Sequence, residues 1–340
     1  MHSTGGIMRL PFSPVVLPWH EKLVEEPELI SEFIIQYMHN ARDSLLPTLE
    51  DKYASRENVR STNACELTEL YYWTEEKPVR LPWKELPKRC VIKTNHWSGD
   101  GIFIMDGAEN PIKGVKKDMA IQEIYRVVRD GKDQDGKKWS SAKIERKLTR
   151  LVKKHYPFLH EWAVRNIEPR GVMVEELLLT ESGQTPDDIK IHCFSGKAGF
   201  VQYEVGKFTS VRQNLHDPIT GEQIAQTINR KWPPIDEIKN LKEYLGEDMF
   251  NGIVEVAEKL SQEVPYVRVD LFMVDSKIYF GEFTLYPRSG EKQSKEWEEL
   301  GGKLWKEGLQ RKSYPFKPFQ AFCAHPFGFN MPYIFLIQKP

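Results

Sequence analysis

The sequence predicts an α+β fold. Short apolar strands and amphipathic helices are mixed along the chain, without the regular strand–helix alternation that builds a parallel sheet. Hydrophobic residues make up 40% and aromatic residues 11% of the 340 residues, which is typical of a globular protein. A chain of this length is expected to bury a large core and to divide into two or three packed lobes.

Apolar residues at helical spacing locate the expected helices. Ile144, Leu148 and Leu151 recur at this spacing and predict one apolar face. Pro265 ends another expected helix and delivers the chain into a hairpin. The four segments expected to be helical are residues 27–45, 116–129, 140–155 and 251–264.

Short apolar runs bounded by turn residues predict strands. They occur at residues 90–93, 102–105 and 189–194, and another follows the turn that opens residues 167–179. The last fifty residues hold many prolines and aromatic residues, so we expect an irregular C-terminal wrap there.

The stretch "VRVDLFMVDSKIYFGEF" (residues 267–283) predicts two strands joined by a tight turn at "DSK". It carries Asp270 in the first strand and Glu282 in the second. Acidic residues are disfavoured in strands and are rarely buried unless they are paired or bind a metal. Either these carboxylates face water, or a cation lies between them.

The length of the turn decides whether the two acids share a face, because directly opposite residues of an antiparallel pair do so. A two-residue turn places Asp270 opposite Gly281 and sends Glu282 to the other face. A three-residue turn, or an equivalent bulge, places Asp270 opposite Glu282 and Arg268 opposite Thr284. We predict the second arrangement, because it forms one polar strip and leaves an apolar face for the core.

A glycine-rich stretch, "KTNHWSGDG" (residues 93–101), lies between two predicted strands. Glycines let backbone N–H groups converge on an anion, and a nearby lysine adds a full charge, as a triphosphate requires. The spacing matches neither of the common phosphate-loop motifs. The candidate residues are Lys93, His96, Ser98, Gly99 and Gly101.

Each of these features also has an ordinary explanation. The glycine-rich stretch could be a simple hairpin turn, and the two acids could form a solvated face neutralised by Arg268 or Lys277. Mg²⁺ in proteins takes one or two carboxylates together with substrate phosphates and waters. A phosphate loop and a carboxylate pair in one chain are therefore the minimum set for binding Mg²⁺ and ATP.

Charge and cysteine content exclude several classes. Lys and Arg total 48 against 49 Asp and Glu, a net charge of −1 that argues against general binding of nucleic acid or anionic membranes. The four cysteines are scattered without a C-x-x-C pair, which disfavours a zinc site or disulfide framework and favours the cytoplasm. We expect neither a signal peptide nor a membrane span.

Several blocks of sequence resemble, in order, the ATP-grasp superfamily and its TupA-like (teichuronopeptide-biosynthesis) branch. The resemblance implies an ATP-grasp fold in which two α+β lobes hold the nucleotide. The implied regions are 1–85 on the substrate side, 86–172 with the glycine-rich loop, 173–290 with the hinge and metal hairpin, and the wrap 291–340. The blocks are residues 49–60, 86–101, 161–178, 187–202 and 267–290.

The resemblance also implies roles for residues on the nucleotide side. Lys93 would reach the ATP phosphates, and His96, Ser98, Gly99 and Gly101 would form the mobile loop over them. The backbone of a hinge would read the adenine edge, and Asp188 would contact the ribose. The implied hinge residues are Glu175, Glu176, Leu177 and Leu178.

For catalysis, the resemblance implies that Arg268 stabilises the transferring phosphoryl group and that Lys190 points at the phosphates. Asp270 and Glu282 match the Mg²⁺ ligands. Thr284 occupies the position where many ATP-grasp enzymes have Asn, and a hydroxyl is a weaker ligand than an amide. The implied cofactors are therefore ATP and one or two Mg²⁺ ions.

The implied activity is an ADP-forming carboxylate–amine ligase that works through an acylphosphate. Its substrates would be an amino acid and a uronic acid, peptide or small molecule, in cell-surface polysaccharide or related biosynthesis. Arg212 and Arg288 are candidates for holding a substrate carboxylate, and equally for surface ion pairs. Two alternatives are a kinase for a sugar or small metabolite on the same scaffold and a non-catalytic binding protein.

The oligomeric state is not indicated by the sequence. The basic segment 137–155 is interpreted as a solvated helix face or as a docking surface for an anionic polymer.

Overall fold

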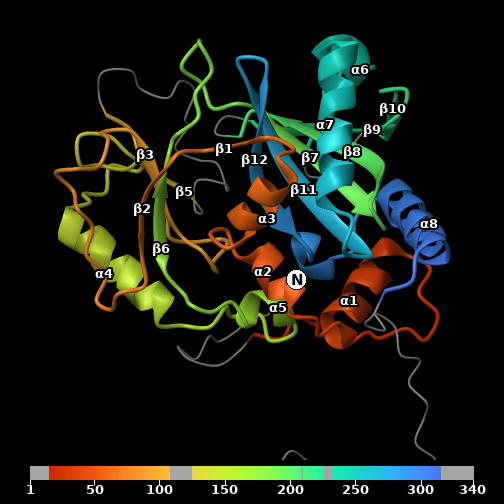
Figure 1. The fold of residues 1–340 in the computed structure, drawn as a ribbon, viewed down its shortest axis with the longest axis horizontal. Coiled ribbons are helices and arrows are strands. Elements are labelled where there is room, and N and C mark those ends of the chain that lie inside the picture. The colour runs from red at the N-terminus through yellow and green to blue at the C-terminus, as the bar shows by residue number, and fades with distance from the viewer. Residues whose placement is uncertain (1–14, 108–124, 208–209, 226–231, 315–340) are drawn as a thin grey trace, which may run out of the picture.

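The computed structural model describes residues 15–107, 125–207, 210–225 and 232–314. They form two sheets that lie side by side, with helices beneath and outside them (Figure 1). This mixed architecture confirms the α+β prediction. In the described residues, no helix has both the length and the apolar character needed to cross a membrane.

The larger sheet has seven strands in the order β1-β12-β11-β7-β8-β9-β10. All neighbours are antiparallel except β1, which runs parallel to β12. The helix α7 (Glu247–Leu260) packs against this sheet through Phe250, Ile253 and Ala257, which are fully buried. The strands are β1 Glu66–Leu67, β7 Asp188–Phe194, β8 Lys197–Val205, β9 Arg212–His216, β10 Gln223–Ala225, β11 Tyr266–Val274 and β12 Lys277–Thr284.

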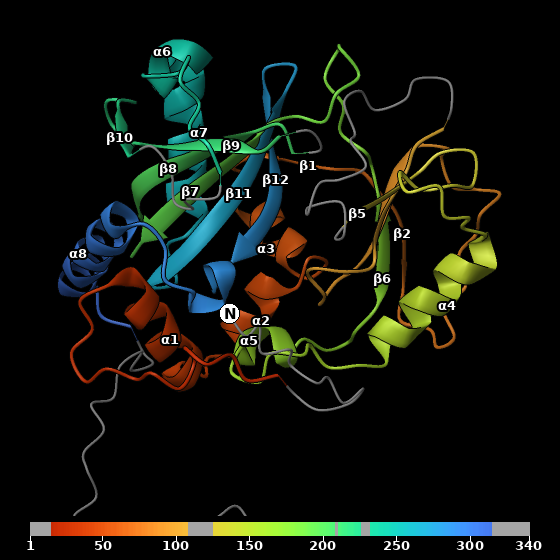
Figure 2. The ribbon, with the colours of Figure 1, turned by 180° about the vertical axis from the view of Figure 1, so that it is seen from behind.

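The smaller sheet has five strands in the order β2-β6-β3-β4-β5. Alternation along β4 sends Phe103 to one face, where it packs with Ile144 and Leu148 of α4 (Ser141–Val152), and Ile104 to the other. The helix α4 therefore covers the face that is turned away from the larger sheet (Figures 1 and 2). The strands are β2 Leu70–Thr74, β3 Cys90–Thr94, β4 Ile102–Met105, β5 Tyr125–Val128 and β6 Val172–Glu175.

Eight α-helices complete the described residues. The helices α2, α3 and α5 gather at the base of the molecule, between the two sheets, whereas α4 lies on the outer side of the smaller sheet (Figure 2). Because β1 joins the larger sheet and β2 the smaller one, the N-terminal region contributes to both. The helices are α1 Ile30–Asn40, α2 Leu45–Glu50, α3 Ser55–Thr62, α4 Ser141–Val152, α5 Trp162–Arg165, α6 Leu241–Leu245, α7 Glu247–Leu260 and α8 Lys295–Arg311.

The expected irregular wrap after residue 291 is wrong for its first part, which forms α8. Ser294 caps this helix by accepting a hydrogen bond from the backbone N–H of Trp297. Trp297 and Trp305 are buried, and Trp305 stacks on Phe33 of α1 with ring centroids 5.2 Å apart. The prolines that suggested irregularity all follow residue 314, outside the described residues.

The helix expected at residues 116–129 is also corrected. Tyr125–Val128 is the strand β5, paired in parallel with β4, and the rest of that segment lies outside the described residues. Burial of Val127 and Val128 in the sheet explains why the β-branched pair outweighs the apparent helical spacing.

The hairpin of β11 and β12 has a two-residue turn, so the three-residue turn is wrong. Asp275 and Ser276 have φ values of 50° and 60°, and Val274 pairs with Lys277. The equivalent bulge is present instead. Leu271 pairs with Phe280, the register shifts at Gly281, and Asp270 pairs directly with Glu282.

Only glycine fits this bulge without movement of its neighbours. A Cβ at position 281 would lie 2.9 Å from Phe272 and 3.0 Å from the backbone oxygen of Asp270. A two-residue turn alone would have sent Glu282 to the face opposite Asp270. The bulge at Gly281 shifts the register by one residue and so restores the predicted polar strip.

Candidate functional site

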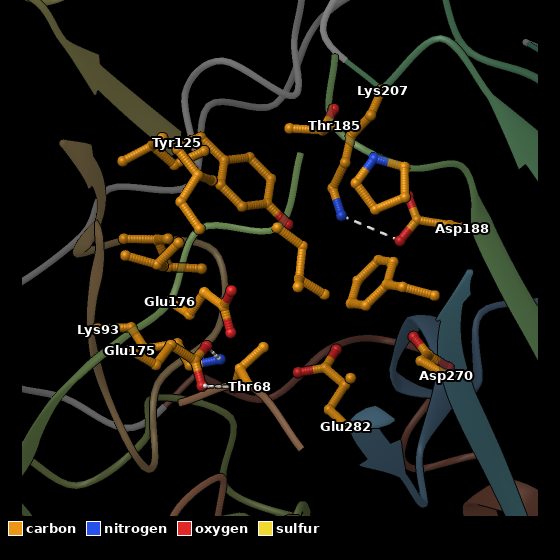
Figure 3. A pocket seen from close by; sticks show the side chains of 18 of the residues that line it. Thr68, Lys93, Tyr125, Glu175, Glu176, Thr185, Asp188, Lys207, Asp270 and Glu282 are labelled. Carbon is orange, nitrogen blue, oxygen red and sulfur yellow. Dashed lines mark hydrogen bonds and ion pairs between the residues drawn. The ribbon is translucent and has the colours of Figure 1, made fainter. Parts of the chain in front are cut away.

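A cavity between the two sheets contains most of the predicted nucleotide residues (Figure 3). The smaller sheet contributes an apolar wall that includes Val91, Ile102 and Ile104. The larger sheet contributes Phe272 and Gly281. A slot with apolar walls on two sides suits a flat ring such as a purine.

The expected hinge follows the end of β6, and all four of its residues line the cavity. It is tied to the segment before β2, because the backbone N–H of Glu176 donates to the oxygen of Glu69 at 2.9 Å and the Glu69 N–H donates to the Glu176 carboxylate at 3.1 Å. The hinge therefore has a fixed position beside the apolar slot.

Lys93 projects from β3 into the cavity and forms an ion pair with Glu175. Arg56 of α3 lies 3.4 Å from the same carboxylate, and the Thr68 hydroxyl donates to it at 2.9 Å. Two cations thus surround the carboxylate of Glu175 and hold it in place beside the cavity.

On the opposite wall, Asp188 accepts from Lys207 at 3.0 Å and lies 3.3 Å from Lys190 (Figure 3). Burial alone would raise the pKa of Asp188, but these two ammonium groups lower it to about 2. Lys190 also lies 2.8 Å from Glu204 and sits beneath the cavity rather than in its lining. Lys207 lines the cavity, with its Nζ 5.3 Å from the ring centre of Tyr125.

The hairpin supplies the acidic strip of the site. Arg268 holds Asp270 through two hydrogen bonds, from Nε at 2.6 Å and from a terminal nitrogen at 2.7 Å, and donates to the Thr284 hydroxyl at 3.0 Å. Glu282 lies 3.4 Å from Lys52. Burial would raise the pKa of Glu282, but Lys52 and Arg268 lower it to about 2, so this carboxylate is ionised at neutral pH.

The two acids fit a Mg²⁺ site that a nucleotide completes. Asp270 and Glu282 lie opposite each other and line the same cavity (Figure 3). Within the described ranges there is no cluster of three or more His, Cys, Asp or Glu side chains that could hold a metal alone. One or two carboxylates are enough when phosphate oxygens and waters supply the remaining ligands.

The sequence model of the TupA-like ATP-grasp family matches residues 33–306, which is more than half of the chain. The chain belongs to this family. A search of curated proteins returns no match.

Three solved structures with some similarity are ligases, and two of them are described as ATP-grasp ligases. D-alanine–D-alanine ligase from Bacillus anthracis in complex with ATP is 14% identical, with a TM-score of 0.39, over 78% of this chain and 67% of that one. ATP-grasp ligase PsnB with a minimal precursor is 11% identical, with a TM-score of 0.34, over 80% and 63%. A Chryseobacterium gregarium RiPP-associated ATP-grasp ligase with ADP and a leader and core peptide is 10% identical, with a TM-score of 0.34, over 82% and 65%.

In this TupA-like ATP-grasp protein, the glycine-rich loop residues lie outside the cavity lining and contact the α4 region instead. The Ser98 hydroxyl is 2.8 Å from that of Tyr156, and a His96 ring nitrogen is 3.1 Å from the Lys154 oxygen. Gly99 and Gly101 have positive φ values of 79° and 74°. His96 is buried, and burial lowers its pKa to about 4.

The two arginines considered for a substrate carboxylate lie away from the cavity. Arg212 is 2.6 Å from Glu237, and Arg288 is 3.4 Å from Glu291. Neither arginine lines the nucleotide cavity. The structure thus shows surface ion pairs, the second interpretation that the sequence allowed.

Sequence reasoning missed residues at the end of α2 and in the segment between α2 and α3, which together reach both sheets. Lys52 contacts Glu282, and Asp51 accepts from the side chain of Asn95, two residues after Lys93. Glu50 accepts from the backbone N–H of Leu285 at 2.6 Å, and burial raises its pKa to about 7. These residues fall within the family block 49–60, which could have drawn attention to them.

Proposed function

We propose that this protein is an ATP-dependent carboxylate–amine ligase that forms an amide through an acylphosphate and releases ADP and phosphate. The observation that carries the proposal is the meeting of two half-sites in one cavity. The smaller sheet brings Lys93 and the hinge, and the larger sheet brings the acids Asp270 and Glu282. A module that only binds nucleotide has no need of an ion-paired acid strip facing its phosphates, whereas phosphoryl transfer does.

In this proposal the apolar slot holds the adenine and the hinge backbone reads its edge. Asp188, fixed by Lys207, contacts the ribose. Lys93 and Lys207 supply positive charge to the phosphates from opposite walls. Lys190 acts indirectly, because its contacts with Asp188 and Glu204 hold the ribose side in position.

Asp270 and Glu282 would hold a Mg²⁺ ion, which neutralises phosphate charge and favours departure of ADP. Arg268 keeps Asp270 oriented and brings a cation to the same face. Thr284 already accepts a hydrogen bond from Arg268, so we assign a single ion to the two carboxylates.

The reaction proceeds in two displacements. A substrate carboxylate oxygen attacks the γ-phosphorus, and the bond between that phosphorus and ADP breaks. An amine then attacks the acyl carbon and loses a proton. The bond between the acyl carbon and the bridging oxygen breaks, and phosphate leaves with the carboxylate oxygen that had attacked phosphorus. The chain contributes positioning and charge neutralisation, and closure of the loop over the phosphates excludes water from the acylphosphate.

Lys52 is the best-placed residue for the substrate carboxylate, in place of Arg212 and Arg288. It lines the cavity next to Glu282, and it comes from the N-terminal region that we assign to substrate selection. We propose an amino acid and a uronic acid, peptide or small molecule as substrates, used in cell-surface polysaccharide or related biosynthesis. Cys65, Cys90 and Cys193 are free thiols, in keeping with the cytoplasm as the proposed location.

The test is a screen of amino acids against uronic acids and short peptides, with ADP and free phosphate measured together. A ligase releases both products in equal amounts, and only when both substrates are present. A kinase releases ADP and leaves the phosphate on its acceptor. ADP and phosphate formed at the same rate whatever is added would contradict both activities.

A further inference from the structure

A hollow on the outer side of the smaller lobe is lined by an unusual concentration of positive charge. It lies along α4 and the turn before it, on the side of the sheet opposite the nucleotide cavity. We call this hollow the basic groove. The cations that line it are Lys137, Lys143, Arg146, Lys147, Arg150 and Lys154. The whole chain has a net charge of only −1, so these six residues represent a local excess.

The cations follow one stripe of the helix. Lys143, Lys147 and Arg150 of α4 are separated by three or four residues, which places them on one side over about 11 Å, and Lys154 follows just after the helix ends. Arg146 and Arg150 are exposed. Like charges four residues apart repel each other, so an array of this kind destabilises the free helix and is stabilised by an extended anion.

A single carboxylate, Asp100 of the glycine-rich loop, faces these cations among the residues that line the groove. It lies 2.5 Å from Lys147 and also accepts from the backbone N–H of Gly101. Asp100 thus occupies one position that an anionic ligand would take, and the other cations of the stripe extend beyond it.

The groove offers no surface for stacking or for membrane insertion. Its aromatic residue, Trp139, is 7% exposed and lies beneath the ammonium groups of Lys137 and Lys143, 4.9 and 4.6 Å from the ring centre. Single-stranded nucleic acids stack their bases on open aromatic side chains. The large apolar side chains that the described residues expose lie elsewhere, whereas a membrane-bound helix needs them beside its cations.

We propose that the basic groove binds a peptide segment rich in Glu or Asp. Flexible carboxylate side chains on an extended backbone can follow the stripe without stacking. Binding of such a segment goes beyond the proposed ligase chemistry and does not depend on it.

Binding in the groove is also connected to the loop beside the nucleotide cavity. A peptide carboxylate would compete with Asp100 for Lys147. Leu151 of α4 packs against Gly101, and the backbone oxygen of Lys154 lies 3.1 Å from a ring nitrogen of His96. An acidic peptide in the groove would therefore loosen the loop from α4.

The test measures binding of fluorescein-labelled poly-L-glutamate to the full chain at low and at physiological salt. Wild type is expected to bind with an affinity that falls as salt rises. The double variant Arg146→Glu/Arg150→Glu should bind at least about tenfold more weakly, because two exposed cations are replaced by anions. The matched control is Lys259→Glu/Lys292→Glu, which makes the same charge change at exposed positions outside the groove and should stay within about twofold of wild type.

The variant Asp100→Asn should change the affinity for poly-L-glutamate in the opposite direction. Removing the carboxylate that occupies Lys147 should strengthen poly-L-glutamate binding by about threefold. The proposal is overturned if wild type does not bind poly-L-glutamate at low salt, or if the groove variant binds as well as the control. It is equally overturned if polygalacturonate or a short DNA duplex binds as tightly as poly-L-glutamate.

Discussion

The hairpin of β11 and β12 and the glycine-rich loop 93–101 supply opposite parts of the same proposed site, and they differ in how they are held. The hairpin acids lie in the cavity, fixed by strand register and by Arg268. The loop side chains lie outside the cavity lining, on Tyr156 and the end of α4. Paired strands thus preorganise the half that we propose holds metal, whereas the loop would have to leave its contacts to cover a nucleotide.

The largest expected effect is on the preorganised half. Asp270→Asn or Glu282→Gln should each lower Mg²⁺-dependent ADP release by at least about 100-fold, because each removes one charge aimed at the phosphates. The measurement is kcat under saturating substrates, with Asp275→Asn at the exposed hairpin tip as the control. Near-normal rates in both site variants would break the comparison, since the hairpin would then be only structural.

Lys93 lies where the two halves meet, at the strand end that begins the loop. Lys93→Ala should weaken ATP binding or slow phosphoryl transfer by about 30-fold, because a full charge near the phosphates is lost. Glu175 keeps Arg56 and Thr68 as partners, so the thermal midpoint should change little. An unfolded variant with no separate kinetic defect would make "KTNHWSGDG" an ordinary turn.

The third prediction tests whether Lys52 binds the substrate carboxylate or the nucleotide. Lys52→Ala should raise KM for the carboxylate substrate by about tenfold while KM for ATP stays within about twofold, because we assign the lost cation to the substrate carboxylate rather than to the nucleotide. The exposed Lys84→Ala serves as the control. A larger rise in KM for ATP than for the carboxylate would move Lys52 to the nucleotide side.

The smallest expected effect is on the pH dependence of stability. The loop and the hairpin should lose their contributions to the free energy of unfolding in different pH ranges. The folded pKa of His96 is lowered to about 4 by burial, so its contribution to stability is complete above the unfolded pKa of about 6.5 and is lost as pH falls toward 4. The folded pKa of Glu282 is lowered to about 2, so its contribution is lost only below about pH 4.3, the unfolded value. The loop side is therefore weakened first by acid.

Urea unfolding at pH 7 and pH 5.5 checks this order. Wild type should lose about 1 kcal/mol more than His96→Gln over that interval, because only wild type takes up a proton at position 96 on unfolding. Equal losses in the two proteins would mean that His96 is accessible to protons in the folded state.

The comparison also explains which parts of the site the sequence could predict. The hinge after β6 and the acids of the hairpin were predicted from strand periodicity and family blocks, and the structure brings them to one cavity. The turn length was wrong because Asp275 and Ser276 both adopt positive φ without a glycine, while the compensating Gly281 resembles any strand glycine in sequence.

Lys52 and Lys207 could not be predicted in the same way. Both lie outside helices and strands, where no periodicity fixes a direction, and their positions depend on contacts between segments far apart in the chain. The prediction of an irregular wrap over the last fifty residues was wrong at α8 because it rested on average composition. The residues before 314 and after it differ in proline content, and one average over both hides the buried face of Trp297 and Trp305.

The most direct test of the central claim follows an oxygen atom. The substrate pair found in the screen is supplied with heavy-isotope oxygen in its carboxylate, and the released phosphate is analysed by mass spectrometry. An acylphosphate route transfers one labelled oxygen to each phosphate, since the carboxylate oxygen that attacks phosphorus leaves with it when the amine forms the amide. Unlabelled phosphate beside a formed amide, or phosphate retained on the acceptor, would contradict the ligase mechanism.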